Sequence, residues 1–149
     1  MAFSSITVKD IKEVNKGMTA EAYTSLTTAL ATNGETSATY GGYFVMDERD
    51  DKYLLLFHNS DTDPHTVTIQ AGDALQGVNS CALTIAASKY TALSIESGRF
   101  KRVSANEGYA DLAKTIPHGV STAGFTEKGK VFFTSDSASV KAAIFKLPV

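Results

Sequence analysis

The stretch Thr66-Val67-Thr68-Ile69-Gln70 decides the fold class of this sequence. Its two β-branched apolar side chains, Val67 and Ile69, face one way, and its three polar side chains face the other. This is the period-two pattern of a strand that is buried on one face. The same alternation recurs further along the chain, at residues 81–85, 93–95, 131–133 and 140–144. The repetition predicts a protein built mostly of half-buried β-strands.

A continuous apolar run, Tyr53–Phe57, precedes this stretch and is bounded by turn residues. Such a run is typical of a central strand that is covered on both faces. Turn signals such as Asp47–Asp51 and His58–Pro64 separate the strand segments. Short strands separated in this way predict a mostly β protein, either an antiparallel β-sandwich of Ig-like or jelly-roll-like form or a small barrel. Because no long amphipathic helices alternate with the strands, a parallel α/β sheet is disfavoured.

The first part of the chain does not fit a minimal sandwich, because it is rich in Thr, Ser and Ala. We therefore divide the chain into an N-terminal arm, residues 1–42, and a β-sandwich domain, residues 43–149. We expect the arm to pack on the domain or on a neighbouring molecule. Thr19 could cap a short helix that Asn33-Gly34 closes, although the threonines of this segment favour extended structure nearly as well. The apolar face of that helix would consist of Ala22, Leu26, Ala29 and Leu30.

Residues 104–129 form a long loop excursion within the sandwich domain. The segment has little periodicity and contains several glycines and one proline. It is long for a connection between strands, and such length usually means function or disorder. We therefore expect contacts with partners in this excursion and in the N-terminal arm.

The composition restricts the classes of partner. The chain has 149 residues, of which 43% are hydrophobic and 20% charged, as expected for one soluble globular domain. A formal charge of −2 provides no basic field, which disfavours nucleic acid. Cys81 is the only cysteine, so one chain can form neither an internal disulfide nor a thiolate metal cluster. The N-terminus lacks the pattern of a secretory signal, and no run approaches the length of a membrane helix, so we expect no membrane partner.

Two near-matches to catalytic motifs fail at a required position. Gly119–Ala123 lacks the final glycine of a nucleophile elbow. Gly124–Lys130 is followed by Val131, where a phosphate-binding loop needs Ser or Thr, and then by a strand pattern instead of a helix. His58, His65 and His118 have no spacing that ties them to a nucleophile, so we expect no enzymatic activity.

The sequence also offers no complete metal site. A blue-copper site needs a Cys-His-Met cluster, but the only histidine after Cys81 is His118 and all three methionines precede Cys81. Asp61 and Asp63 lack the glycine and the bidentate glutamate of a calcium loop. We therefore expect no metal and no cofactor.

Two further features have a structural and a functional interpretation. Cys81 alternates with Leu83 and Ile85 on the inferred buried face, which predicts a small core side chain. Arg99, Lys101 and Arg102 form a local basic cluster. It is interpreted either as a solvated strand end or as a charged patch that contacts a partner.

Four segments together resemble a known family: Tyr53–Asn59, Thr66–Gly72, Ile95–Phe100 and Val140–Pro148. They are similar to small β-sandwich proteins encoded among the structural genes of tailed bacteriophages, head decoration or auxiliary capsid proteins in particular. The resemblance covers roughly residues 40–149, and the excursion departs from the tightest form of the pattern. It implies a protein assembled in the host cytoplasm and located on the capsid exterior of the virion. The implied partners are the major capsid protein and further copies of the chain, for example in a trimer.

Apolar and aromatic side chains in otherwise polar segments are suitable anchors for such an interface. The candidates in the N-terminal arm and in the excursion are Phe3, Ile6, Val8, Tyr109, Leu112, Ile116, Pro117 and Phe125. The alternative interpretation is that they hold their own segments on the domain.

A second functional hypothesis is a tail-associated or host-surface module that recognises carbohydrate through aromatic platforms. Its candidate platform residues are Tyr40, Tyr43, Tyr53, Tyr90 and Tyr109.

Overall fold

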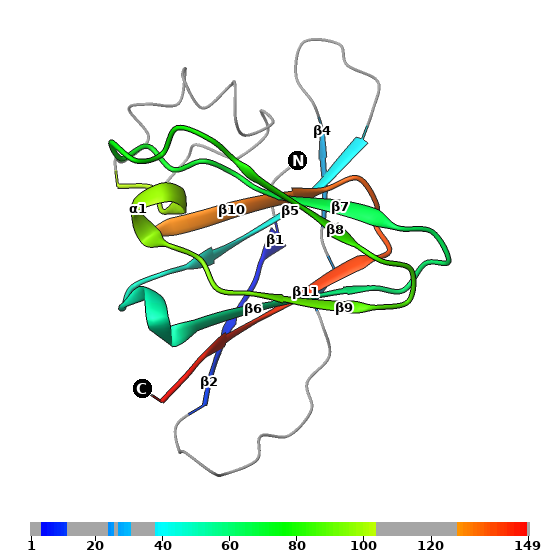
Figure 1. The fold of residues 1–149 in the computed structure, drawn as a ribbon, viewed down its shortest axis with the longest axis horizontal. Coiled ribbons are helices and arrows are strands. Elements are labelled where there is room, and N and C mark those ends of the chain that lie inside the picture. Colours follow the sequence, from blue (N-terminus) through cyan, green and yellow to red (C-terminus); the bar gives the residue numbers. More distant parts are fainter. Residues whose placement is uncertain (1–3, 12–23, 26, 31–37, 104–127, 149) are drawn as a thin grey trace.

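The computed structural model describes residues 4–11, 24–25, 27–30, 38–103 and 128–148. They form a β-sandwich of two sheets, as the alternating pattern predicted (Figure 1). The first sheet consists of β1 (Ser4–Ser5), β4 (Thr27–Leu30), β5 (Ala38–Val45), β10 (Lys130–Ser135), β7 (His65–Ile69) and β8 (Cys81–Ile85). The second sheet consists of β2 (Val8–Asp10), β3 (Thr24–Ser25), β11 (Val140–Lys146), β6 (Tyr53–Asn59) and β9 (Tyr90–Leu93). The described helices, η1 (Asp50–Lys52) and α1 (Ser97–Phe100), are single turns, and neither is long enough to cross a membrane.

The longer strands pair antiparallel, in the order β5-β10-β7-β8 in the first sheet and β11-β6-β9 in the second. The connections β5–β6, β6–β7, β8–β9 and β10–β11 each pass from one sheet to the other. Both sheets therefore contribute side chains to one core, in which Phe57 and Phe133 meet edge to face with ring centroids 5.3 Å apart.

Strand β6 lies between β11 and β9, as expected of a central strand, but only one of its faces is fully covered. Tyr53, Leu55 and Phe57 point into the core, whereas Leu54 and Leu56 remain half-buried on the outer face. The prediction of a strand covered on both faces was therefore wrong for β6. The second sheet packs on the first with one face only, as antiparallel sheets commonly do.

Short strands from residues 1–42 add to one edge of each sheet. Strands β1 and β4 pair with β5, and strands β2 and β3 pair with β11. Strand β5 runs through positions 42 and 43, where we divided the arm from the domain.

The short helix predicted between Thr19 and Asn33 was wrong for the part that the structure describes. Thr24–Ser25 and Thr27–Leu30, which includes Ala29, are strands. Thr27 pairs with Gly41 and Leu30 with Ala38. Threonine is β-branched and favours extended structure, and the edge of β5 provides backbone hydrogen-bond partners for a strand. The extended alternative therefore prevails. Thr19, Ala22, Leu26 and Asn33-Gly34 lie outside the described residues.

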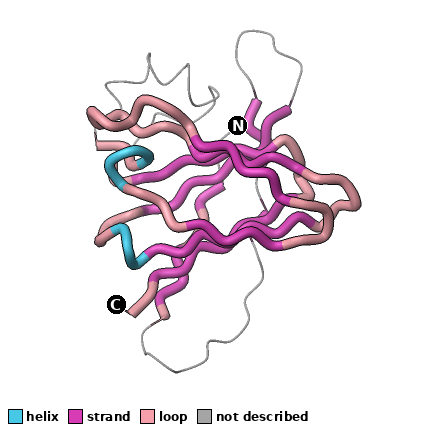
Figure 2. Tube along the Cα trace, in the orientation of Figure 1, coloured by secondary structure: helices cyan, strands magenta, loops and turns pink. Residues whose placement is uncertain are grey.

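Loops and turns gather at the two ends of the sandwich (Figure 2). We call one end the turn end; it carries residues 60–64, 86–89 and 136–139. We call the other the α1 end; it carries residues 46–52 and 70–80 together with helix α1. The two ends differ in chemistry, and this difference defines the candidate site.

Candidate protein-binding surface

The loop between β7 and β8 presents two apolar side chains to solvent at the α1 end. We call residues 70–80 the Leu75 loop. The side chain of Leu75 is 98% exposed, and that of Val78 is 75% exposed. Single exposed apolar residues are ordinary on protein surfaces, but two on one short loop are a suitable anchor for a partner.

Close backbone contacts hold the Leu75 loop in shape. The Gly72 N–H donates to the Arg99 carbonyl at 2.7 Å, and the Gly77 N–H donates to the Ala74 carbonyl at 2.8 Å. A Cβ at Gly72 would lie 2.6 Å from the Lys101 carbonyl oxygen, and a Cβ at Gly77 would lie 2.3 Å from that of Gly72. Both positions therefore need glycine because of close backbone approach. The loop is folded on itself and on α1, so Leu75 and Val78 are displayed by ordered backbone.

Asp73 and Arg102 support the base of the loop. Asp73 Oδ1 accepts a hydrogen bond from the Val103 N–H at 2.6 Å, and Asp73 Oδ2 lies 3.7 Å from Arg102 Nη2. Arg102 is only 5% exposed and also donates to the Ala71 carbonyl at 3.4 Å. A buried guanidinium needs partners of this kind, since an uncompensated buried charge is strongly destabilising.

Burial of Arg102 corrects the interpretation of the basic cluster as one surface patch. The Arg99 guanidinium lies over the Phe100 ring, 5.0 Å from its centroid, whereas Arg102 points into the protein. The cluster is thus divided: Arg99 is exposed, Lys101 is half-buried and Arg102 is internal.

The two ends of the excursion meet beside the Leu75 loop. The Arg102 N–H donates to the Lys130 carbonyl at 2.8 Å, and the Gly129 N–H donates to the Arg102 carbonyl at 2.7 Å. Val103, the last described residue before the excursion, is 47% exposed. We call Leu75, Val78 and Val103 the apolar tip.

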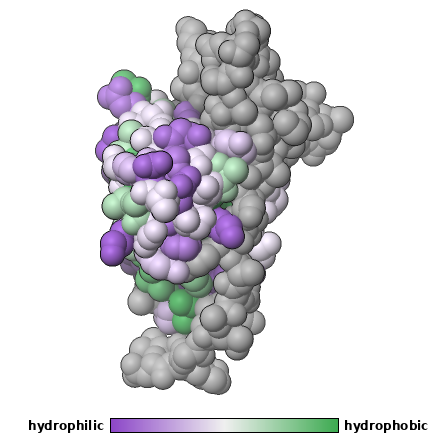
Figure 3. Space-filling view, turned by 90° about the vertical axis from the view of Figure 1, so that its right-hand side faces the viewer, coloured by the Kyte–Doolittle hydropathy of each residue, from purple (hydrophilic) through white to green (hydrophobic). Residues whose placement is uncertain are grey.

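The turn end has the opposite character, because polar side chains bond to one another there. Asn59 is fully buried; its Nδ2 donates to the Asp63 carbonyl at 2.7 Å and to the Ile85 carbonyl at 3.1 Å, and its Oδ1 accepts from the Asp61 N–H at 2.9 Å. Ser139 Oγ also contacts Asp61 Oδ2, at 3.3 Å. Viewed from this end, the described surface is mostly hydrophilic, with apolar residues toward its margins (Figure 3).

His65 connects two turns at this end. Its Nε2 lies 3.1 Å from Asp61 Oδ2, and its Nδ1 lies 3.2 Å from Asp136 Oδ1. The hydrogen bond from His65 lowers the pKa of Asp61, with a further contribution from the Thr62 N–H. Asp61, compared above with the ligands of a calcium loop, thus bonds an imidazole and neighbouring hydroxyl and amide groups. Among the described residues, no three His, Cys, Asp or Glu side chains form a group that could hold a metal ion.

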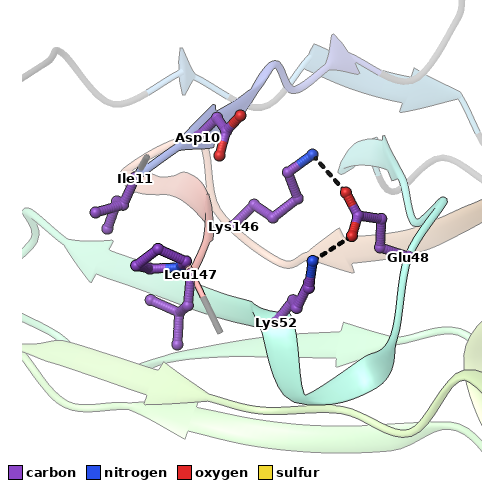
Figure 4. Close-up of a pocket in the computed structure, with 7 residues that line it drawn as sticks. Asp10, Ile11, Glu48, Lys52, Lys146 and Leu147 are labelled. Carbon is purple, nitrogen blue, oxygen red and sulfur yellow. Dashed lines mark hydrogen bonds and ion pairs between the residues drawn. The ribbon is translucent and has the colours of Figure 1, made fainter. Parts of the chain in front are cut away.

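A charged hollow of about 260 Å³ lies where the ends of β2 and β11 meet the 46–52 turn (Figure 4). Glu48 lies between two lysines: it bonds Lys52, and Lys146 Nζ is 3.1 Å from its Oε1. These two hydrogen bonds lower the pKa of Glu48, and the bond to Glu48 raises the pKa of Lys146. The charges of the hollow therefore balance one another and tie β11 to the turn.

The structure places two of the predicted interface residues. Ile6 is 3% exposed and belongs to the hydrophobic core, and Val8 is half-buried against that core. Both therefore pack on their own domain. Phe3, Tyr109, Leu112, Ile116, Pro117 and Phe125 lie outside the described residues.

The remaining candidates are dispersed. Cys81 is half-buried against the core, on the face that the alternation predicted. Tyr53 is buried, and Tyr43 packs on Phe132 with ring centroids 5.5 Å apart. Tyr90 belongs to the second sheet, where it stacks on His58 with ring centroids 4.2 Å apart. Tyr40 is half-buried against the core, and Tyr109 lies outside the described residues.

Leu75 and Val78 were missed at the sequence level, although a signal was present. They are apolar residues in a glycine-containing, otherwise polar loop, which is the criterion that selected candidates in the arm and the excursion. No known protein family, curated protein or solved structure matches this chain.

Proposed function

We propose that this protein is a virion structural protein of a tailed bacteriophage, and specifically a head decoration protein. It binds the outer capsid surface through contacts with the major capsid protein and stabilises the shell, without catalysing a reaction. Two kinds of evidence support the proposal. One is the resemblance of four segments between Tyr53 and Pro148 to head decoration proteins, and the other is the apolar tip.

The exposure of Leu75 and Val78 on an ordered loop is the observation that carries the proposal. An apolar anchor on preorganised backbone loses little conformational entropy on binding, so more of its burial energy appears as affinity. The α1 end can contact a broad protein surface, because Leu75 and Val78 are exposed side chains of a loop and do not lie inside a cleft.

Binding at one tip is compatible with a strong effect on a capsid. A shell repeats the same site many times, and copies that are linked to one another bind with an increased effective concentration. Any protein that binds the assembled shell but not its separated subunits shifts the equilibrium toward the shell. Modest affinity for each copy is therefore sufficient.

The test uses purified phage shells that lack the protein. The wild-type chain, a Leu75→Ser/Val78→Ser double variant and an Ala138→Ser control are each incubated with these shells, which are then pelleted. Ala138 is an exposed apolar residue at the turn end, so the control changes a similar surface far from the tip. We expect the wild type and the control to pellet with the shells and to raise their melting temperature, and the double variant to remain in the supernatant.

Equal pelleting of all three chains would contradict the role of the apolar tip. Failure of the wild type to bind any shell would contradict the proposed function. Electron microscopy of virions gives an independent location, and density on the tail in place of the head would favour the carbohydrate-recognition hypothesis.

A further inference from the structure

Each sheet has one edge that described strands cover and one edge beside which the structure describes no further strand, called here the open edge. The edges at β5 and β11 receive the short strands from residues 1–42. Strands β8 and β9 end their sheets on the other side, and no described strand pairs with their outer edges. Because residues 86–89 connect these two strands directly, both open edges lie on the same side of the sandwich.

The open edges lack the features that usually prevent pairing with another chain. Residues 74–88, which include all of β8, contain no Asp, Glu, Lys or Arg, and Tyr90–Leu93 contains none either. Neither strand contains proline. Edge strands are commonly protected by charges, proline or bulges, and an uncharged edge without them is a template for strand addition. The outward side chains Ala82, Thr84 and Ala92 are small and exposed, and the larger Tyr90 stacks on His58 of the adjacent strand β6, so room is left for a neighbouring strand.

We propose that a second copy of this chain occupies both open edges, with β8 of each copy paired to β9 of the other. Strands β8 and β9 run in opposite directions, because β8 runs toward the 86–89 turn and β9 runs away from it. Suppose that a two-fold axis parallel to the strands relates the two copies. Each strand of the second copy then runs in the same direction as in the first, and the first sheet of one copy lies in the same layer as the second sheet of the other. The axis therefore places β8 against β9 of the second copy in the antiparallel sense, at two symmetric positions.

The spacing of the layers agrees with this arrangement. Packed sheets lie about 10 Å apart, and the two-fold operation preserves that distance, so both strand pairs can form at once. The first sheet of each copy then continues into the second sheet of the other. Inward side chains such as Leu83 and Leu93, which pack on the core of their own copy, extend into one shared core.

The same axis leaves both α1 ends pointing in one direction. The two Leu75 loops of such a dimer therefore face the same way. The inference stands without the proposed function, but it would give a shell-binding dimer two tips for one surface. A dimer built on β8 pairing with β8 would instead point the two loops in opposite directions.

Charge substitutions on the outward faces of β8 and β9 test the pairing. In the proposed dimer, position 84 of one copy lies opposite or diagonally next to position 92 of the other, where side chains interact. In Thr84→Lys/Ala92→Lys, two lysines meet at each strand pair. In Thr84→Lys/Ala92→Glu, opposite charges meet there. Both positions are exposed, so the core of each copy is unchanged.

Sedimentation velocity over a concentration series, with circular dichroism to check folding, measures the outcome. We expect a wild-type dimer, dissociation of the Lys/Lys variant by at least tenfold in Kd, and a dimer for the Lys/Glu variant. A wild-type monomer or trimer, or equal association of both variants, would overturn the proposal. If a variant fails to fold, a wild-type monomer or trimer still overturns the proposal. A monomer that still binds shells would contradict only this inference, whereas a dimer that binds no shell would contradict only the proposed function.

Discussion

His65 Nε2 lies 3.1 Å from Asp61 Oδ2, and this contact closes the turn between β6 and β7. The other ring nitrogen, Nδ1, lies 3.2 Å from Asp136 Oδ1, in the turn between β10 and β11. Only a doubly protonated imidazole can donate to both carboxylates. A doubly protonated His65 therefore joins the two turns through one hydrogen bond to each carboxylate.

The acid stability of the protein should depend on Asp61. The hydrogen bond from His65 lowers the pKa of Asp61 below its ordinary value of 3.8 in the folded state. The unfolded state then binds the proton more tightly, so the stabilisation is fully present above pH 3.8 and is lost as the pH falls through the folded-state pKa. We expect the free energy of unfolding of the wild type to decrease more steeply below pH 3.8 than that of Asp61→Asn.

Urea denaturation at a series of pH values measures this difference. Asp63→Asn is the matched control, because Asp63 contacts Asn59 through its backbone carbonyl. The control should follow the wild type. An identical pH dependence for Asp61→Asn and the wild type would show that the contact with His65 adds no stability.

Asn59→Ala should be among the most destabilising polar substitutions. The Asn59 amide is fully buried and bonds three carbonyls and one N–H across two turns. Removing it takes a hydrogen-bond partner from each of these groups, and the contact with the Ile85 carbonyl is fully buried, so we expect a cost of about 2–4 kcal/mol. Urea denaturation measures the change, and Ser60→Ala, at an exposed neighbour, should cost much less. A loss of similar size in both variants would contradict this account.

Gly77→Ala and Gly129→Ala should both destabilise, for different reasons. A Cβ at Gly77 would lie 2.3 Å from the Gly72 carbonyl oxygen, so the Leu75 loop must move. Gly129 has a φ of +78° and nothing within 4 Å of its Cβ position, so alanine there costs backbone strain alone, roughly 1 kcal/mol. Thermal melts compare the stabilities, and shell binding should fall for Gly77→Ala only. Normal binding by a folded Gly77→Ala chain would show that the loop tolerates a different shape.

Phe57→Ala tests the contact between the two sheets. The ring is fully buried and meets Phe133 edge to face, so its removal should cost about 3–5 kcal/mol. Leu54→Ala, on the half-buried outer face of the same strand, should cost clearly less. Chemical denaturation of the two variants measures the difference, and equal losses would indicate that the outer face is packed as tightly as the core.

The alternation of side chains was sufficient to predict the strands and the sandwich. Val67 and Ile69 face the core and are fully buried, as the pattern at Thr66–Gln70 indicated. Periodicity reports which face of a strand is buried but not which strand lies beside it. The addition of β1–β4 to β5 and β11 therefore could not be predicted, and the threonines of the segment left a helix and extended structure as alternatives.

The candidate site was less predictable than the fold, because it depends on contacts between distant residues. Arg102 looks like a surface cation in the sequence and becomes internal only because Asp73 and the Ala71 carbonyl lie beside it. Leu75 is displayed because Gly72 and Gly77 allow close backbone approaches that no local pattern reveals. His65 likewise acquires its role from Asp136, which lies far away along the chain.

The hydrogen bonds that join Arg102 to Gly129 and Lys130 have a consequence for engineering. The described residues that flank positions 104–127 lie beside each other, so a connection of another length would start and finish in the same place. Lengthening such a connection costs little, since closure entropy grows only slowly with length. This position is therefore suited to grafting a foreign peptide or reporter between two flanks that the hydrogen bonds of Arg102 hold together.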